Sequence, residues 1–455
     1  MRRKNNSSSI LFLIIFGAII GGVVFLYNSV MFERNAPVVT VTQAEYWNLK
    51  EPIDISIEDD SGIKWYEVKM ISSEGEKVLT QEALLLPKGK LQLKVEYPKM
   101  SYGIKDENIK IIVTAVDVSK WDFFAGNTTS VEKSFIIDKK KPLVSLITNS
   151  YGIYKGGSAL VIFKAKDENL EDMYIEVNKK KRFKVQPFHE EGNYASLVAW
   201  PVTENKFDAR IIVKDKAGNT MRVHIPYYHK AKSYRVSNIK LSDRFLKGKI
   251  AELAYEYPET QGIEDAIEQF KVINEDVRAN NEKIIHDITS KVSDTMISNF
   301  SIKPFYPLKN AAKVASFGDH RKYFYKKKKV SESYHLGLDL ASVKMGEIKT
   351  QNYGMTVFAE ENGIYGNLPI IHHGMGLYTI YGHCSSLRVA AGDAVKPNDN
   401  VANTGKSGYA MGDHLHFGVL VQGVEVRPEE WMDEDWIRLN ITEVMKNAKK
   451  LISRS

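Results

Sequence analysis

The apolar run near the N-terminus constrains the fold of this chain more than any other feature. Residues 10–27 include no charged side chain, and residues 2–4 are all basic. A helix of this length reaches about 27 Å, close to the hydrocarbon thickness of a bilayer. Basic residues ahead of such a run keep the N-terminus in the cytoplasm. We therefore expect a cytoplasmic tail (1–9), one transmembrane anchor (10–32) and a large periplasmic or other extracytoplasmic part, attached to the cytoplasmic membrane.

A cleaved signal peptide is the alternative interpretation of the same run. The best small-x-small cleavage motif ends at Ala36, but Pro37 follows it directly and should hinder cleavage. A signal peptide would also have a shorter apolar core. The sequence therefore favours an anchor that stays attached.

Length and composition limit the domain count and the partners. A chain of 455 residues is too long for one hydrophobic core, which predicts roughly two to four domains. The formal net charge of +7 is modest and the lysines are dispersed, as on ordinary solvated surfaces. Attraction to an anionic lipid or wall polymer is the alternative, and export argues against nucleic acid. Cys384 is the single cysteine, so no intrachain disulfide can stabilise the fold.

The part of the chain after the apolar run has the pattern of short β-strands. Isoleucines alternate with polar residues over 53–57, and glycine turns separate such runs. An A-G-N-T turn between two strands begins at Ala125 and occurs again at Ala217. This repeat is typical of tandem β-sandwiches of about 100 residues each, and it resembles the immunoglobulin-like repeats of bacterial surface proteins. We expect two such modules, over residues 37–138 and 139–229.

Two roles remain open for these β-sandwich modules. They can bind a protein partner or a wall polymer. They can also act as spacers that hold the C-terminal part away from the membrane. The residues do not favour one role over the other.

A helical connector is predicted between the modules and the C-terminal part. Ser242 is placed to cap a helix, and apolar residues recur at steps of three and four between Ile263 and Val277. A break at Tyr257-Pro258 separates the two runs. The pattern indicates an amphipathic helical pair within a packed connector over residues 230–300. A regulatory arm is the alternative.

Two histidine motifs in the C-terminal part can provide metal ligands. The first contains His335 and Asp339, whose Cα atoms would lie about 13 Å apart in an extended strand. Gly337 between them allows the backbone to bend and bring the two side chains together. The second motif is His414-Leu415-His416. Residues i and i+2 of a strand share one face, so both imidazoles should point into one cleft.

Two imidazoles and a carboxylate suit catalytic zinc, which takes three protein ligands and leaves one position open for water. The metal lowers the pKa of that water towards about 7 and polarises a carbonyl. His383 shares a strand face with Tyr381 and can transfer protons or stabilise an oxyanion. The adjacent Cys384 should point the other way, which disfavours a cysteine nucleophile.

The order of these motifs and the glycines around them resemble the LytM or lysostaphin-type zinc metallopeptidases, which cleave peptidoglycan cross-links. The resemblance covers residues 305–431. It departs from the family at Cys384, where leucine is usual, and at Gly418, where an acidic residue is usual. The motifs are His335-x-Gly337-x-Asp339, His373-Gly374-x-Gly376, Tyr381-x-His383, Gly405-x-Ser407-Gly408 and Gly412-x-His414-Leu415-His416-Phe417.

The resemblance implies an antiparallel β peptidase domain over residues 301–432 with one zinc ion per chain, and we expect a C-terminal helix over 433–455. The basic segment 321–329 stands where the family has a variable loop; it can line the groove, contact acidic stem peptides or form a solvated loop. Carried over by position, the zinc ligands are His335, Asp339 and His416, the catalytic residues that do not bind metal are His383 and His414, and we add Tyr381 and His320 as candidates for the groove wall.

The expected function is that of a membrane-anchored zinc endopeptidase. It would hydrolyse amide bonds in peptidoglycan peptides for wall remodelling, cell shape or division. The expected partners are peptidoglycan, the membrane through the N-terminal helix, and proteins that bind the β-modules. The alternative is a non-catalytic regulator of the same fold that activates another wall hydrolase. Such regulators usually lack a metal ligand, whereas this sequence has all three.

Overall fold

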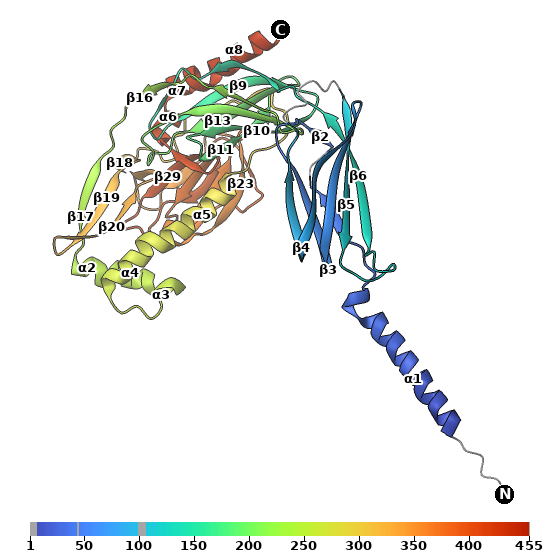
Figure 1. Ribbon diagram of the computed structural model, residues 1–455. Helices are drawn as coiled ribbons and strands as arrows, with labels where there is room; N and C mark the ends of the chain where they lie inside the picture. Colours follow the sequence, from blue (N-terminus) through green and yellow to red (C-terminus); the bar gives the residue numbers. More distant parts are fainter. Residues whose placement is uncertain (1–6, 43–44, 99–105, 455) are drawn as a thin grey trace. The chain divides into compact units, whose positions relative to one another are not determined.

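The protein is mostly β-structure, as expected, with one apolar helix at its N-terminus (Figure 1). The computed structural model describes residues 7–42, 45–98 and 106–454. The predicted cytoplasmic tail therefore lies largely outside the described residues, because residues 1–6 are not among them. The chain divides into two compact units. Unit 1 consists of Met1–Pro142, Asp167–Glu171 and Lys214–Thr220, and unit 2 of Leu143–Lys166, Asp172–Val213 and Met221–Ser455.

Helix α1 (Ser7–Asn28) begins unit 1. It is the one helix in the described part of the chain whose length and composition would allow it to cross a membrane, over Ile10–Asn28. All side chains of that stretch are exposed, so the protein itself does not bury them. A short 3-10 helix, η1 (Val30–Phe32), follows.

Unit 1 continues with a six-stranded sheet in the order β1-β3-β5-β6-β2, with β4 paired to β3. Its alternating residues point inwards, and Ile53, Ile55 and Ile57 are fully buried against Trp47 and Phe135. The pairing of β3 with β4 shifts register three times, twice between Glu58 and Trp65 and once after Val68. The strands are β1 (Val38–Val41), β2 (Tyr46–Trp47), β3 (Ile53–Ser72), β4 (Gly75–Val95), β5 (Asn108–Asp117) and β6 (Thr128–Ile137).

The two A-G-N-T turns have the same hydrogen bonds. The backbone and the side-chain amide of Asn127 donate to the two carboxylate oxygens of Asp117, both at 2.8 Å. Asn219 donates to Asp215 in the same way, at 2.8 and 2.9 Å. The repeat therefore extends from the sequence to the local structure. That the two modules are immunoglobulin-like remains a prediction.

Two four-stranded sheets follow, in the orders β11-β10-β14-β15 and β12-β13-β9-β7. Strand β9 forms much of the core, since six consecutive residues from Ser158 to Phe163 are buried. The strands of these sheets are β7 (Leu143–Asn149), β9 (Ser158–Lys166), β10 (Leu170–Val177), β11 (Lys181–Lys184), β12 (Gln186–Pro187), β13 (Asn193–Ala199), β14 (Ala209–Asp215) and β15 (Thr220–His224). Strands β8 (Gly152–Tyr154) and β16 (Tyr228–Lys230) pair with each other, and β17 (Val236–Lys240) leads into the C-terminal part.

The helices of the connector begin where Ser242 caps α2, as predicted, by accepting a hydrogen bond from the Phe245 amide. Phe270 and Ile273 are fully buried in one core with Ile370 and Leu420 of the C-terminal sheet. The helices are therefore part of the C-terminal core. They are α2 (Asp243–Phe245), α3 (Ala251–Glu256), α4 (Ala266–Val272) and α5 (Arg278–Thr289), joined by η2 (Leu246–Ile250), η3 (Pro258–Thr260) and η4 (Ile273–Val277).

The C-terminal part is built on an eight-stranded sheet in the order β18-β21-β29-β25-β24-β23-β27, with β30 paired to β29. Two three-stranded sheets, β17-β19-β20 and β22-β28-β26, accompany it. The strands are β18 (Ala312–Ala315), β19 (His320–Tyr325), β20 (Lys328–Tyr334), β21 (Leu338–Ala341), β22 (Glu347–Lys349), β23 (Gly354–Glu361), β24 (Asn367–His372), β25 (Leu377–Gly382), β26 (Ser386–Leu387), β27 (Ala394–Val395), β28 (Asn400–Asn403), β29 (Leu415–Val421) and β30 (Val424–Val426).

The remaining helices of the C-terminal part are short. Helix η5 (Gly363–Tyr365) lies between β23 and β24. Helices α6 (Pro428–Trp431), α7 (Glu434–Ile437), η6 (Arg438–Thr442) and α8 (Glu443–Ile452) complete the chain.

Candidate functional site

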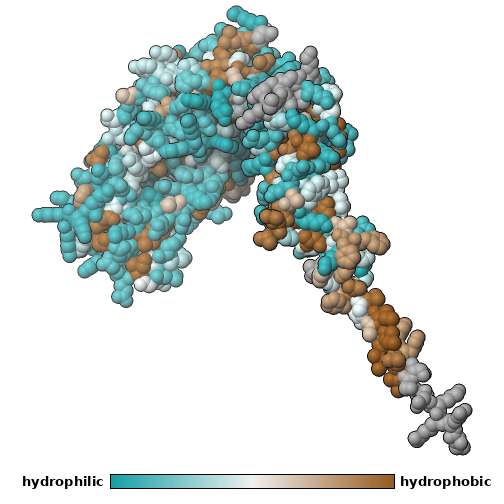
Figure 2. All heavy atoms as spheres, in the orientation of Figure 1, coloured by the Kyte–Doolittle hydropathy of each residue, from teal (hydrophilic) through white to brown (hydrophobic). Residues whose placement is uncertain are grey.

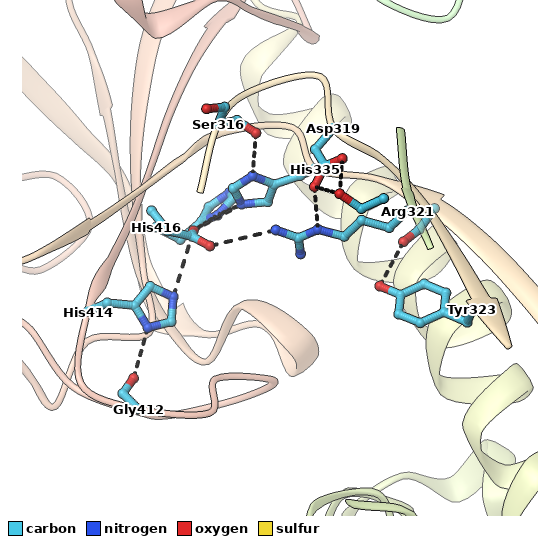
Figure 3. Close-up of polar contacts among 11 residues, drawn as sticks. Ser316, Asp319, Arg321, Tyr323, His335, Gly412, His414 and His416 are labelled. Carbon is cyan, nitrogen blue, oxygen red and sulfur yellow. Dashed lines mark hydrogen bonds and ion pairs between the residues drawn. The ribbon is translucent and has the colours of Figure 1, made fainter. Parts of the chain in front are cut away.

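Three side chains from separate stretches of the sequence meet at the centre of the C-terminal sheet. Asp339 on β21 is the direct cross-strand partner of His416 on β29. His335, just before β21, completes the group. Its Nε2 lies 2.9 Å from Asp339 Oδ1 and 3.2 Å from His416 Nδ1. The His416 Nδ1 to Asp339 Oδ1 distance is 3.1 Å (Figure 3).

The geometry of these three atoms fits a zinc ion. Ligands about 2.0–2.1 Å from a tetrahedral metal are separated from one another by about 3.3 Å, close to the observed spacing. His335 Nδ1 donates to the Ser316 carbonyl at 2.9 Å, which leaves Nε2 free of hydrogen and turned towards the group. His335 and His416 are 7% and 5% exposed, so water competes little for these positions.

The protonation states also suit metal binding. Burial raises the pKa of the Asp339 carboxyl, but the close approach of His335 and His416 outweighs burial and holds that pKa well below its usual range. Burial lowers the pKa of His416. An anionic carboxylate and neutral imidazoles are the forms that bind zinc.

Two glycines make room for the ring of His416. A Cβ on Gly337 would lie 2.6 Å from His416 Nε2 and 2.8 Å from the Phe417 carbonyl oxygen. On the other side, Gly382 of β25 pairs with His416, and a Cβ there would lie 3.3 Å from His416 Cβ. The backbone bends at Gly337, as the sequence predicts, and His335 and Asp339 come together. The structure adds a second role for this glycine, the close packing against His416.

His383 and His414 lie beside the three ligands. His414 Nε2 is 3.7 Å from Asp339 Oδ1, and its Nδ1 donates to the Gly412 carbonyl at 2.8 Å. The ring centroids of His383 and His414 are 4.9 Å apart. His383 Nδ1 donates to the Ser407 carbonyl at 2.9 Å. Burial, with the charges of His416 and His414, lowers the pKa of His383 to about 3.

The backbone at His383 is unusual, because its φ of 65° is in the left-handed region. Its amide donates to the Tyr365 carbonyl at 2.8 Å, which helps to hold this conformation. Strained residues of this kind occur mostly at functional sites. This turn ends the alternation of β25, so His383 and Tyr381 do not share a face.

A groove of about 450 Å³ opens onto His335, Asp339 and His416. The connector forms one wall, which the sequence interpretation did not foresee. The Phe245 ring stacks on Tyr409 with their centroids 6.1 Å apart. The lining residues are Ile239, Lys240, Leu241, Ser242, Phe245, Arg278, Arg321, Tyr323, Ser333, Tyr334, His335, Leu336, Asp339, Ile364, Tyr365, His383, Tyr409, Met411, His414 and His416.

Arg321 extends from β19 towards His335 and His416 (Figure 3). Its Nη2 lies 3.9 Å from Asp339 Oδ2, and its Nε lies 3.6 Å from Asp319 Oδ2. Asp319 in turn accepts hydrogen bonds from the Ser237 hydroxyl. The sequence interpretation named the basic segment that contains Arg321 but did not single out this residue. Nothing in the sequence around Arg321 indicates that its side chain points towards the site.

The two residues expected in the groove wall do not line the groove. Tyr381 is fully buried, its ring packs on Phe417 at 5.6 Å, and its hydroxyl accepts a hydrogen bond from Thr379. The strand alternation turns it into the core. His320 stacks on Tyr334 and bonds to Glu332 at 3.0 Å.

Cys384 is fully buried, and burial raises the pKa of its thiol to about 12. A thiol in this state is a poor nucleophile.

Comparison with known proteins gives a family for this region. Residues 333–428 match Peptidase family M23. Stage II sporulation protein Q of Bacillus subtilis is 33% identical over 102 residues, which are 22% of this chain and 36% of that protein. DD-carboxypeptidase/endopeptidase Mpg of Neisseria meningitidis serogroup B is 31% identical over 94 residues, which are 21% of this chain and 22% of that protein.

A third relative is named for a different activity. Murein hydrolase activator EnvC of Escherichia coli is 28% identical over 96 residues, covering 21% of this chain and 23% of that protein. In all three comparisons the match spans little more than a third of the relative, or less. The Peptidase family M23 match, residues 333–428, contains the five site residues.

Proposed function

Because the chain carries a Peptidase family M23 domain at residues 333–428, we propose that it is a zinc metallopeptidase that hydrolyses amide bonds in peptidoglycan peptides. The observation that supports this most is the ligand set. His335, Asp339 and His416 bring three suitable donor atoms within 4.8 Å of one another at the base of a groove. Endopeptidase action on cross-links, in wall remodelling, cell shape or division, is the specific activity we propose.

The residues of the site have distinct tasks in this proposal. His335, Asp339 and His416 hold the zinc ion, which when bound supplies a Lewis acid that activates water and polarises the substrate carbonyl. His414 and His383 keep Nε2 without hydrogen, because each Nδ1 donates to a backbone carbonyl. Nε2 of His414 can therefore accept a proton during attack and return it to the leaving amine. Nε2 of His383, whose pKa is held near 3, can accept a hydrogen bond from the attacking water and so orient it.

The charge of the groove favours an acidic peptide as substrate. Arg321 and Arg278 are cations among the lining residues, and Arg321 makes only long contacts, 3.6 and 3.9 Å, to Asp319 and Asp339. A guanidinium with free donors can bind a carboxylate through two hydrogen bonds. Stem peptides of the cell wall carry such carboxylates. The products of a peptidoglycan digest would identify the cross-link that is cut.

The activity test uses residues 1–455 purified in detergent and loaded with zinc. Cross-linked peptidoglycan is incubated with the protein, and the products are identified by mass spectrometry. We expect un-crosslinked muropeptides to accumulate, and His416→Ala to abolish this. His320→Ala is the matched control, since His320 lies outside the groove, and it should keep activity. Failure to digest any cross-linked wall preparation would overturn the proposal.

We also propose that α1 remains attached and anchors the protein to the cytoplasmic membrane, with its N-terminus in the cytoplasm. The support is its length, its apolar composition and its complete exposure. Membranes from producing cells are washed with alkaline carbonate, and the mass of the retained protein is measured. Retention with residues 1–36 present supports the anchor. A mass that begins at residue 37 would establish cleavage instead.

A second function is favoured by one comparison, the relative named as a murein hydrolase activator. In that case the same fold would bind and activate another wall enzyme without using its metal. The double variant His335→Ala, Asp339→Ala tests this in cells that lack the native gene. Rescue of the deletion phenotype by the double variant would support the regulator. If the unaltered protein rescues the phenotype and the double variant does not, the result would support the peptidase function.

A further inference from the structure

The loop between β5 and β6 carries large apolar side chains that face solvent. Phe123 is 96% exposed, Phe124 70% and Trp121 43%. Asp122, Phe123 and Phe124 all have positive φ, a backbone conformation that residues other than glycine rarely adopt. The loop thus holds two phenylalanines outwards at a cost in backbone strain, and nothing in unit 1 covers them among the described residues.

This loop is bonded to the chain that leaves α1. The Lys120 amide donates to the Met31 carbonyl at 2.7 Å, and the Ser119 hydroxyl donates to the Glu33 carbonyl at 2.6 Å. The Arg34 guanidinium lies 3.9 Å from the ring centroid of Tyr27 in α1 and 4.8 Å from that of Trp121. These contacts place the loop at the level of the last turn of α1.

A second exposed apolar pair lies at the same end of the sheet. The β3–β4 register passes from Ile63↔Lys88 to Trp65↔Ala83, so β4 has extra residues there that leave the regular pairing and form a bend. Leu85 and Leu86 project from the bend of β4, 101% and 78% exposed.

Backbone contacts connect this bend to the aromatic loop. A Cβ on Gly62 would lie 2.9 Å from Pro87 Cβ, which directly follows Leu86. The Gly62 carbonyl accepts from the amide of Val118, where the aromatic loop begins. The two apolar groups therefore belong to one end of unit 1, which we call the apolar collar: Leu85, Leu86, Trp121, Phe123 and Phe124.

We propose that the apolar collar inserts into the outer interface of the membrane that α1 crosses, so that lipid covers it. The inference rests on the anchor proposed above. A span of about 30 Å of hydrocarbon ends near the last turn of α1, the level at which the collar lies. Figure 2 shows hydrophobic residues along α1 and again at the end of the sheet next to it.

The composition of the collar suits a lipid surface. Trp and Phe are favoured at the boundary between headgroups and acyl chains. Arg34, Lys64 and Lys120 stand on the same segments, where their cations can reach anionic headgroups. Unit 1 would then sit on the bilayer at two points, the helix and the collar, and would not swing freely on a flexible tether.

The test uses residues 1–455 in nanodiscs of phosphatidylethanolamine and phosphatidylglycerol that hold one copy each. Single cysteines are introduced by Phe123→Cys and, on the other bend, Leu85→Cys. Glu74→Cys is the matched control, since it lies in the exposed hairpin turn at the opposite end of β3 and β4. Gly17→Cys reports on α1 itself. The native Cys384 is fully buried and does not compete for the reagent.

We expect a membrane-impermeant maleimide to modify the collar cysteines about tenfold more slowly than Glu74→Cys, because lipid excludes water from the interface. A fluorophore attached at either collar position should be quenched by lipids that carry a nitroxide near the headgroup. If Gly17→Cys is protected but the collar cysteines react as fast as Glu74→Cys, the insertion of the collar is contradicted and the anchor proposal is not. If Gly17→Cys reacts, both proposals are contradicted.

Discussion

At the scale of single residues, the site depends on small side chains as much as on its ligands. The ring of His416 lies between Gly337 and Gly382, and neither position has room for a Cβ without displacement. The ligand atoms then face one another at 2.9–3.2 Å. Metal affinity should therefore respond to substitutions that leave all ligands in place.

Gly337→Ala tests this. Its new Cβ would lie 2.6 Å from His416 Nε2, so the ring or the nearby Phe417 carbonyl must move. We expect zinc affinity to fall about 10- to 100-fold, the range seen when the support of a ligand is disturbed. Competition with a chromophoric chelator measures the change. Gly412→Ala is the control, with no atom within 4 Å of its Cβ. Equal affinity in both variants would contradict the packing argument.

Glu430 should make the stability of the folded protein depend on pH, whether or not a metal is bound. It is 4% exposed, and burial raises its pKa from 4.5 to about 7, against the opposing charge of Arg427 and hydrogen bonds from Ser158. Between these two pKa values the folded protein binds a proton that the unfolded chain has released. Stability from this group is therefore complete below about pH 4.5 and is lost as the pH rises through 7.

Glu430→Gln should remove that loss. We expect the unaltered protein to lose about 2.5 kcal/mol more than the variant between pH 5 and pH 8, since each pKa unit corresponds to about 1.4 kcal/mol. Urea unfolding at the two pH values measures the difference. Glu434→Gln replaces an exposed carboxylate nearby and should behave like the unaltered protein. Parallel pH profiles for all three proteins would refute the assignment.

At the scale of elements, the connector is part of the C-terminal fold. Phe270 of α4 packs edge-on against Tyr323 of β19 at 5.1 Å and against Phe245 at 6.3 Å. Phe245 in turn stacks on Tyr409 in the groove. The same helices that fill the core therefore also shape the wall of the site.

Phe270→Ala should show this coupling. Removing a fully buried ring costs about 3–5 kcal/mol, and the cavity would loosen Phe245 and the groove wall. We expect a lower unfolding midpoint of the C-terminal part together with weaker binding of muropeptides. Tyr255→Ala on the neighbouring helix is the control, because Tyr255 is 92% exposed. Similar midpoints for both variants would argue that the connector is only a tether.

At the scale of the whole molecule, helix α1 and the site belong to different compact units. Helix α1 lies in unit 1, and all five site residues lie in unit 2. The ligands, their backbone partners and the groove wall come entirely from unit 2. Metal binding should therefore not require the anchor.

Removal of residues 1–36 tests this independence. The truncated protein should remain in solution without detergent and bind zinc within about twofold of the longer protein, because no ligand or ligand support is lost. Chelator competition measures the affinity, and sedimentation after ultracentrifugation measures solubility. A loss of zinc binding in the folded, truncated protein would mean that unit 1 supports the site.

Much of this protein follows from local sequence patterns. The uncharged run of α1, the alternation in β3 and the cap at Ser242 each depend on neighbouring residues, and the structure agrees with all three. The meeting of His335, Asp339 and His416 was expected from motif order and residue chemistry. These features depend on neighbouring residues or on the chemistry of the residue types, so they can be predicted from a single sequence.

Tertiary packing alone decided the rest. His383 does not share the buried face of Tyr381 because the strand alternation ends before it, and Arg321 lies near Asp339 because β19 runs beside the site. The connector helices share the core of the C-terminal sheet, and the apolar collar brings together turns distant in sequence. Periodicity determines which face of an element is apolar. Which faces meet depends on contacts between segments far apart in the chain, and these have no local sequence signal.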